Sequence, residues 1–296
     1  METCDPHRGG LPAVVVGFDS AWGDRARGAV CSVAFDGDHL HDFRPPGLVG
    51  FKEAAEFVLA VRRSDRATVV AIDQPTVVPN AAGMRPADRV AASVVSWMGG
   101  GVQPANTGRP FFADDAPIWK FIESVGAARD PDVARTAIAG VHAVEVFPAL
   151  SLAALDGRFC GRLKGPRYNP ARRKTFRLSD WTAVVEAVGA EAARLGFADL
   201  GAWLESSMPK EKPRKEHQDM LDSAVCLLVA LRWRLRPRGE CVMVGDVETG
   251  HIVAASAPAV RERLAVAAAK VGAPMDGIPP KGPIGLGDFA GHPVTP

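Results

Sequence analysis

The chain of 296 residues has little cysteine, almost no net charge and no long apolar segment. Its five cysteines are an odd number and none are spaced as CxxC, which argues against a disulfide framework and a cysteine zinc site. Lys and Arg exceed Asp and Glu by one, so no global field directs the chain to nucleic acid or to a membrane. The longest apolar run, residues 224–231, is far too short to span a bilayer, and residues 1–10 lack a secretory signal pattern. We therefore expect a cytoplasmic protein without a membrane partner.

The sequence also lacks an internal repeat, and its composition is that of an ordinary globular protein. Hydrophobic residues make up 47% of the chain and charged residues 23%, which suffices for a large core without covalent staples. Three continuous apolar runs predict strands buried on both faces, at residues 13–19, 67–73 and 141–147. Two further strands and a helix are expected at residues 28–35, 39–43 and 50–63. An α/β fold is therefore predicted.

Each of the three buried strands carries one acidic residue near its end. Asp19 lies in GFDSAWG, Asp73 in AIDQP and Glu145 in EVFP. In an open α/β sheet, ligands bind beyond the carboxyl ends of the strands, where an acidic side chain is half outside the core. One such acid is more typical of a cap or a turn, but three on separate strands indicate a shared site.

The helix predicted from residue 217 to residue 231 carries two aspartates where its apolar stripe begins. Asp219 and Asp222 lie about 60° apart around the helix axis, and Asp222 points the same way as the apolar face. Burying an unpaired carboxylate costs several kcal/mol, and carboxylates buried together raise one another's pKa. Mg²⁺ or Mn²⁺ would remove this cost, because both ions prefer oxygen ligands. The acids therefore predict a shared metal site.

Three polar residues of this helix, Asp219, Asp222 and His217, also have a simpler structural interpretation. Asp219 lies in the first turn, where an acid complements the helix dipole. Asp222 could pair with an arginine such as Arg85 or Arg89. His217 is more typical of a surface position at a helix start than of a ligand or a base.

Residues 158–177 contain eight Lys or Arg and no acid, with aromatic residues between them. This pattern is typical of a segment that follows phosphates while Tyr168 or Phe176 stacks on a base, although a flexible solvated loop has the same composition. Arg85, Arg89 and Arg109 are further candidates for contact with the scissile or leaving phosphate, although Arg85 and Arg89 could instead form salt bridges with Asp88 or the site carboxylates. The predicted substrate-binding residues are Arg85, Arg89, Arg109, Lys164, Tyr168, Arg173 and Arg177.

The order strand–strand–strand–helix–strand, with an acid in the first and fourth strands, resembles the RNase H fold. HQDMLDSA resembles the last helix of Holliday-junction resolvases in that superfamily. The chain is more closely similar to domain-of-unknown-function family 429, whose members are predicted RNase H-like nucleases. The matching segments span residues 13–254: GFDSAWG, AIDQP, the R-x-x-D-R of residues 85–89, EVFPALS, residues 164–177, HQDMLDSA and GDVETGHIV.

The resemblance implies a single RNase H-like domain over residues 1–296, with a mixed sheet of strand order 3-2-1-4-5 flanked by helices. It further implies a helical insertion at residues 84–140 and a basic loop at residues 156–178. A C-terminal extension, formed by a hairpin and a helix, is expected at residues 237–296.

By the same resemblance, Asp19, Asp73, Asp219 and Asp222 are the expected metal ligands, and Glu145 is a further ligand or an acid behind them. The implied activity is phosphodiester hydrolysis by a two-metal mechanism, in which Asp19 bridges Mg²⁺ or Mn²⁺ ions and His217 relays protons or positions water. The expected partner is DNA or RNA. Two alternatives stay open: a non-catalytic module that binds nucleic acid or a nucleotide, and an actin-like phosphotransferase.

Overall fold

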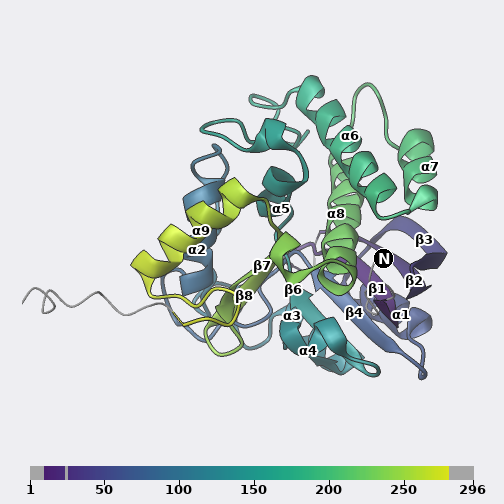
Figure 1. Cartoon of the computed structure of the whole chain (residues 1–296), viewed down its shortest axis with the longest axis horizontal. Helices are drawn as coiled ribbons and strands as arrows, with labels where there is room; N and C mark the ends of the chain where they lie inside the picture. The colour runs from purple at the N-terminus through teal and green to yellow at the C-terminus, as the bar shows by residue number, and fades with distance from the viewer. Residues whose placement is uncertain (1–9, 24–25, 280–296) are drawn as a thin grey trace, which may run out of the picture.

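A six-stranded mixed sheet forms the centre of the computed structural model, which describes residues 10–23 and 26–279 (Figure 1). Its strand order is β3-β2-β1-β4-β6-β5. β1 (Gly10–Asp19), β2 (Gly28–Gly37) and β3 (His39–Val49) pair antiparallel in sequence order. β4 (Ala67–Ile72) lies parallel to β1, and β6 (Val141–Glu145) lies parallel to β4. The predicted α/β class and the order of the five predicted strands are confirmed.

Two features of the sheet differ from the sequence prediction. The two-residue strand β5 (Ala127–Ala128), which was not predicted, pairs with the outer edge of β6. β3 continues to Val49, although Pro45 and Pro46 follow the predicted end at residue 43. As an edge strand, β3 tolerates prolines because not every backbone donor there needs a partner.

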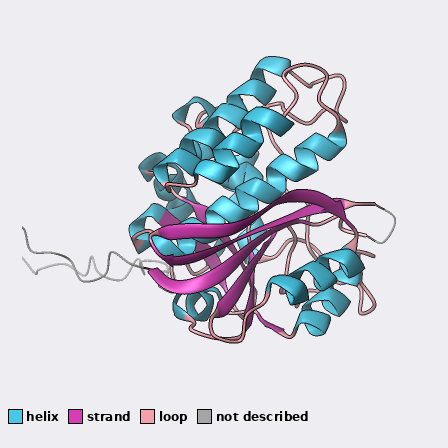
Figure 2. Cartoon of the chain, turned by 90° about the vertical axis from the view of Figure 1, so that its right-hand side faces the viewer, coloured by secondary structure: helices cyan, strands magenta, loops and turns pink. Residues whose placement is uncertain are grey.

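Helices cover both faces of the sheet (Figure 2). One face packs against α8 (Lys215–Leu235), and three further helices join the same core: α5 (Pro148–Leu155), α6 (Leu178–Arg194) and α7 (Ala198–Ser207). The other face packs against α1 (Phe51–Val61) and α3 (Pro117–Val125). The short helix α4 (Pro131–Thr136) precedes β6. The central strands are therefore buried on both sides, as their continuous apolar sequences require.

A smaller core lies beside the sheet, between α2 (Pro86–Val95), the hairpin of β7 (Cys241–Asp246) and β8 (Gly250–Ala255), and α9 (Pro258–Val271). A parallel bridge between Val146 and Val253 joins this hairpin to the chain just past β6. The 3-10 turns Gly157–Phe159 and Arg238–Glu240 complete the elements. The end of the predicted extension, residues 280–296, lies outside the described residues.

None of the helices in the described residues is long and apolar enough to cross a membrane. The four cysteines in this part of the chain, Cys31, Cys160, Cys226 and Cys241, are free thiols, and Cys4 lies outside it.

Candidate metal centre

Four aspartates meet at the carboxyl ends of the central strands. Asp19 ends β1, and Asp73 follows its parallel neighbour β4, where the Asp73 N–H donates to the carbonyl oxygen of Phe18 at 2.9 Å. Asp219 and Asp222 come from the first two turns of α8. The side chains of Asp19, Asp219 and Asp222 are buried. The charges of the other three aspartates all raise the pKa of Asp19, so the four predicted ligands form one cluster.

The helix α8 reaches these strand ends because β1 has a glycine at the point of contact. A Cβ atom at Gly17 would lie 2.2 Å from the carbonyl oxygen of Ser223 and 2.5 Å from the nitrogen of Leu227. Only glycine lets two backbones approach this closely. Ser223 directly follows Asp222, so this contact places Asp222 near the end of β1.

Burial and mutual repulsion raise the pKa of the clustered carboxyl groups. Desolvation is the largest cause for Asp19 and Asp73, and the charge of Asp222 is the next. Burial also raises the pKa of Asp222 to about 6, although hydrogen bonds and the charge of Lys215 oppose the rise. The protein groups around the cluster therefore leave part of its negative charge uncompensated.

Three neighbouring side chains of the described residues partly compensate the negative charge of the aspartates. The hydroxyl of Tyr168 donates to Oδ1 of Asp222 at 2.7 Å, and Nε2 of Gln218 donates to Oδ2 at 2.7 Å. Lys215 forms an ion pair with Asp219 one helical turn later. Burial lowers the pKa of Lys215, but the aspartates outweigh this effect and raise it overall. Two of the four carboxylates are thus engaged by the protein itself.

The donor set fits a hard divalent cation by its chemistry, since carboxylate oxygens are the ligands that Mg²⁺ and Mn²⁺ prefer. As the side chains stand, however, residues 10–23 and 26–279 contain no group of three or more His, Cys, Asp or Glu arranged to hold an ion. Lys215, Tyr168 and Gln218 occupy oxygens of Asp219 and Asp222. An ion would therefore have to displace some of these contacts.

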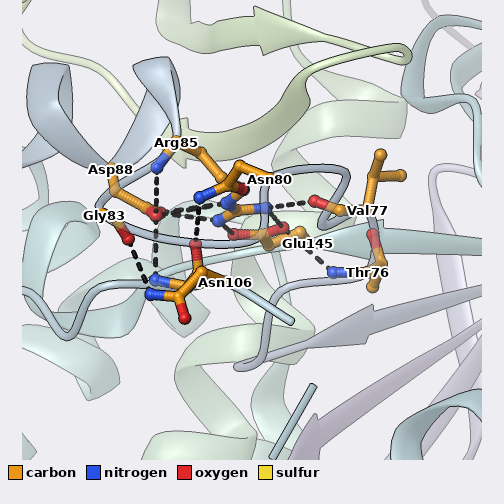
Figure 3. A network of polar contacts seen from close by, with 9 residues as sticks. Thr76, Val77, Asn80, Gly83, Arg85, Asp88, Asn106 and Glu145 are labelled. Atoms are coloured by element: carbon orange, nitrogen blue, oxygen red, sulfur yellow. Dashed lines mark hydrogen bonds and ion pairs between the residues drawn. The ribbon is translucent and has the colours of Figure 1, made fainter. Parts of the chain in front are cut away.

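The fifth predicted acid, Glu145, ends β6 and belongs to a buried ion-pair network (Figure 3). The two terminal nitrogens of Arg85 donate to its two oxygens at 2.8 and 2.6 Å, and the Thr76 N–H donates at 3.1 Å. Arg85 also donates to Asp88 and to the carbonyl oxygen of Val77. Arg85 is only 1% exposed, so the protein encloses this predicted phosphate contact.

The structure places His217 at the start of α8, where Nδ1 accepts a hydrogen bond from the backbone N–H of Arg214 at 2.9 Å. Desolvation lowers the pKa of His217. His217 thus lies at the start of the helix, partly exposed, and its side chain caps the helix end, a role that was not predicted from the sequence.

The basic segment is partly fixed to the rest of the molecule. The N–H groups of Leu163 and Gly165 donate to the carbonyl oxygens of Trp97 and Met98, both at 2.9 Å, just beyond α2. Tyr168, one of the two aromatic residues expected to stack on a base, is instead buried with its hydroxyl on Asp222. The side chains of Lys164, Arg173 and Arg177 are exposed.

Two cavities meet at Asp73. The first has a volume of about 440 Å³ and is lined by Trp22, Gln74, Glu145 and Phe147, among others. The second, of about 380 Å³, is lined by Tyr168, Gln218, Asp222 and the main chain of residues 99–101. Both cavities share Asp73, Gly101, Phe147 and Arg172. Neither is bordered by the other predicted substrate contacts, Arg85, Arg89, Arg109, Lys164, Arg173 or Arg177.

Sequence reasoning missed four residues of this site: Trp22, Arg172, Lys215 and Gln218. Lys215 lies just outside the helix predicted from residue 217, whereas in the structure it begins α8. Its spacing of four residues from Asp219 was the available signal, because such residues are neighbours on a helix. Gln218 has the same spacing from Asp222. Trp22 and Arg172 lay in segments that we had singled out, but the sequence does not reveal which residues of a segment face a cavity.

The sheet order and the acidic cluster together define a mixed α/β protein whose sheet is compatible with the RNase H-like arrangement. The family model described as Protein of unknown function (DUF429) matches residues 17–249, and the chain belongs to this family. The predicted resemblance is thereby confirmed, and the matched region contains all five predicted acids. Searches of curated proteins and of solved structures find no match.

Proposed function

We propose that this chain is a nuclease that hydrolyses phosphodiester bonds with the help of Mg²⁺ or Mn²⁺. The observation that carries the proposal is the cluster of four aspartates, with Lys215 as its one ion-paired cation among the residues that the structure describes. One ammonium group cannot neutralise four clustered carboxylates, three of them buried, and a divalent cation would supply the missing charge.

The proposal gives each residue of the cluster a role. Asp19, Asp73 and Asp222 would hold the cation, and Asp219 would join them once it releases Lys215. A bound cation supplies Lewis acidity and lowers the pKa of water. Tyr168 and Gln218 orient Asp222 through its two oxygens. Arg85 fixes Glu145 behind the cluster, where the charge of Glu145 raises the pKa of Asp73.

Nucleic acid is the proposed substrate because basic side chains border the cavities beside the acids. Arg172 borders both cavities together with Asp73, and Arg167 borders the second. Arginine can donate two parallel hydrogen bonds to a phosphate, which fixes the orientation of the phosphate as well as its charge. The exposed Lys164, Arg173 and Arg177 would add contacts to phosphates further along the strand.

The test is cleavage of labelled single-stranded and duplex DNA and RNA by the full chain, with Mg²⁺, with Mn²⁺ and with chelator. Asp222→Asn is expected to lower the cleavage rate by more than about 100-fold, because it removes a proposed ligand. The matched control is Asp199→Asn, an exposed aspartate in the first turn of α7, which should cleave like the wild type. Unchanged metal-dependent cleavage by Asp222→Asn would contradict the proposal.

A non-catalytic nucleic-acid-binding module is the second candidate, because Asp219 and Asp222 already have partners within the protein. Calorimetric titration with Mn²⁺ separates the two. Heat of binding that disappears in Asp222→Asn supports the nuclease, whereas no binding at millimolar Mn²⁺ supports the module. The actin-like alternative requires a duplicated core, and the described residues form one central sheet.

A further inference from the structure

The cavity of about 440 Å³ beside Asp73 has walls that suit a nucleobase better than a phosphate. Trp22 and Phe147 contribute aromatic rings to its lining. Its charged lining residues are Asp73, Asp88, Glu145 and Arg172, so carboxylates outnumber guanidinium groups and disfavour a phosphate. Flat aromatic side chains bind bases of any sequence, because every base has a π-face.

Trp22 is held in one orientation at the edge of this cavity. Its Nε1 donates to the carbonyl oxygen of Asp73 at 2.9 Å. Its ring meets Phe111 and Phe112 edge-on, with centroids 6.1 and 5.6 Å apart, while part of the side chain stays exposed. Its backbone has φ 59°, a left-handed conformation that is rare for a bulky residue. Such strain clusters at functional sites, and a fixed ring loses little entropy when a ligand stacks on it.

The neighbouring cavity of about 380 Å³ is less acidic, because its charged lining residues are two aspartates, Asp73 and Asp222, and two arginines. Arg167 and Arg172 border it, together with the glycine main chain of residues 99–101. Guanidinium groups are typical phosphate-binding groups, whereas the N–H groups of Gly99 and Gly100 already donate to the carbonyl oxygens of Ser96 and Val95. Asp73 borders both cavities. A nucleic-acid strand with a phosphate in the second cavity could therefore place an adjoining base in the first, with the phosphodiester bond near Asp73.

We infer that Trp22 is the stacking surface for an unpaired nucleobase, and that the substrate class is therefore single-stranded nucleic acid. A base inside a duplex is stacked between its neighbours and cannot enter an aromatic cavity without leaving the helix. The inference deepens the proposed function and rests on it for the identity of the ligand as nucleic acid.

The experiment measures equilibrium binding by fluorescence anisotropy, at fixed ionic strength, with the full chain carrying Asp222→Asn so that cleavage does not interfere. The probes are fluorescein-labelled single strands of DNA and RNA, the same sequences as duplexes, and single strands with abasic sites. Adding Trp22→Ala should weaken binding of the intact strand by about fivefold or more, the loss of one stacked base. Trp22→Phe should retain most of the affinity.

Trp203→Ala is the matched control, because Trp203 is a partly exposed tryptophan on α7 that borders neither cavity. It should bind every probe like the parent protein. Trp22→Ala should leave binding of the abasic strand unchanged, since that strand has no base to lose. Equal weakening of intact and abasic strands, or no weakening at all, would overturn the inference. Duplex binding as tight as single-strand binding would overturn it too.

Two further comparisons test the inference even if Trp22→Ala does not fold or the protein does not cleave nucleic acid. If thermal unfolding shows that Trp22→Ala does not fold, the parent protein alone decides: equal affinity for intact and abasic strands refutes base stacking. The assay also separates this inference from the proposed hydrolysis, because it measures no cleavage. Base-dependent binding through Trp22 without metal-dependent cleavage would leave the inference standing, whereas cleavage combined with base-independent binding would refute only the inference.

Discussion

At the scale of single residues, Asp222 is where burial, hydrogen bonding and charge oppose one another most directly. Its pKa is about 6 in the folded chain, against an ordinary value of 3.8. Between these values the folded state binds more protons than the unfolded state. The free energy of unfolding of the metal-free protein should therefore fall as the pH rises from 3.8 to about 6. This loss of stability is complete above about pH 6.

Replacing Asp222 by asparagine should remove this penalty. The asparagine oxygen can still accept from Tyr168, and its amide can donate to Oε1 of Gln218, which is buried without a partner in the described residues. We expect Asp222→Asn to be about 1–3 kcal/mol more stable than the wild type near neutral pH and nearly equal to it at about pH 4. Urea unfolding in chelator at the two pH values measures the difference.

Asp199→Asn again provides the control, because this aspartate is exposed and lies outside the cluster, so its substitution should change the stability only slightly. Saturating Mn²⁺ should reverse the order of stability, since it stabilises only the protein that keeps its ligand. A loss of stability in Asp222→Asn that is the same at both pH values would mean that the carboxylate is stabilising without a metal.

At the scale of elements, the contact between β1 and α8 brings the two aspartates of α8 close to the two aspartates at the strand ends. Gly17→Ala puts a methyl group against the backbone of Ser223 and Leu227, which cannot rotate away. We expect a loss of about 1–3 kcal/mol in stability, typical of an overpacked core, and weaker binding of Mn²⁺ because α8 must shift away from Asp19. Urea unfolding and calorimetry measure the two effects on the same protein.

Gly201→Ala is the control for this change. Gly201 lies within α7 with no atom close to the position of an added Cβ, so alanine should stabilise the helix by about 0.5–1 kcal/mol and leave Mn²⁺ binding unchanged. If Gly17→Ala keeps full affinity for Mn²⁺, the close approach of α8 is not what positions Asp222.

The elements were the part of this molecule that the sequence predicted best. Asp19 and Asp73 follow apolar runs long enough to identify as buried strands, so the edge at which they meet could be inferred from their order. The contact of Tyr168 with Asp222 could not be inferred, and for Arg85 the sequence left pairing with carboxylates and contact with a phosphate as two open alternatives. Each contact depends on where a loop returns to the sheet, and nothing local in the sequence distinguishes a buried, paired arginine from one that awaits a phosphate.

At the scale of the whole molecule, Arg85 connects the main sheet to the smaller core beside it. It binds Glu145 at the end of β6 and Asp88 in α2, and its side chain packs against the backbone of Gly250 in the hairpin. All three charged groups are buried, with exposed fractions of 1% for Arg85, 2% for Asp88 and 3% for Glu145. Removing one member of such a network leaves a buried charge without a partner.

Arg85→Met should therefore lower the free energy of unfolding by about 3–5 kcal/mol, measured by urea denaturation. Arg27→Met, which removes an exposed ion pair to Glu53, should change it little. Adding Glu145→Gln to Arg85→Met should restore part of the loss, because the double variant buries one carboxylate without its arginine, that of Asp88, instead of two. If Arg85 instead serves mainly to bind phosphate, Arg85→Met will remain as stable as the wild type and lose affinity for nucleic acid, and the second substitution will restore nothing.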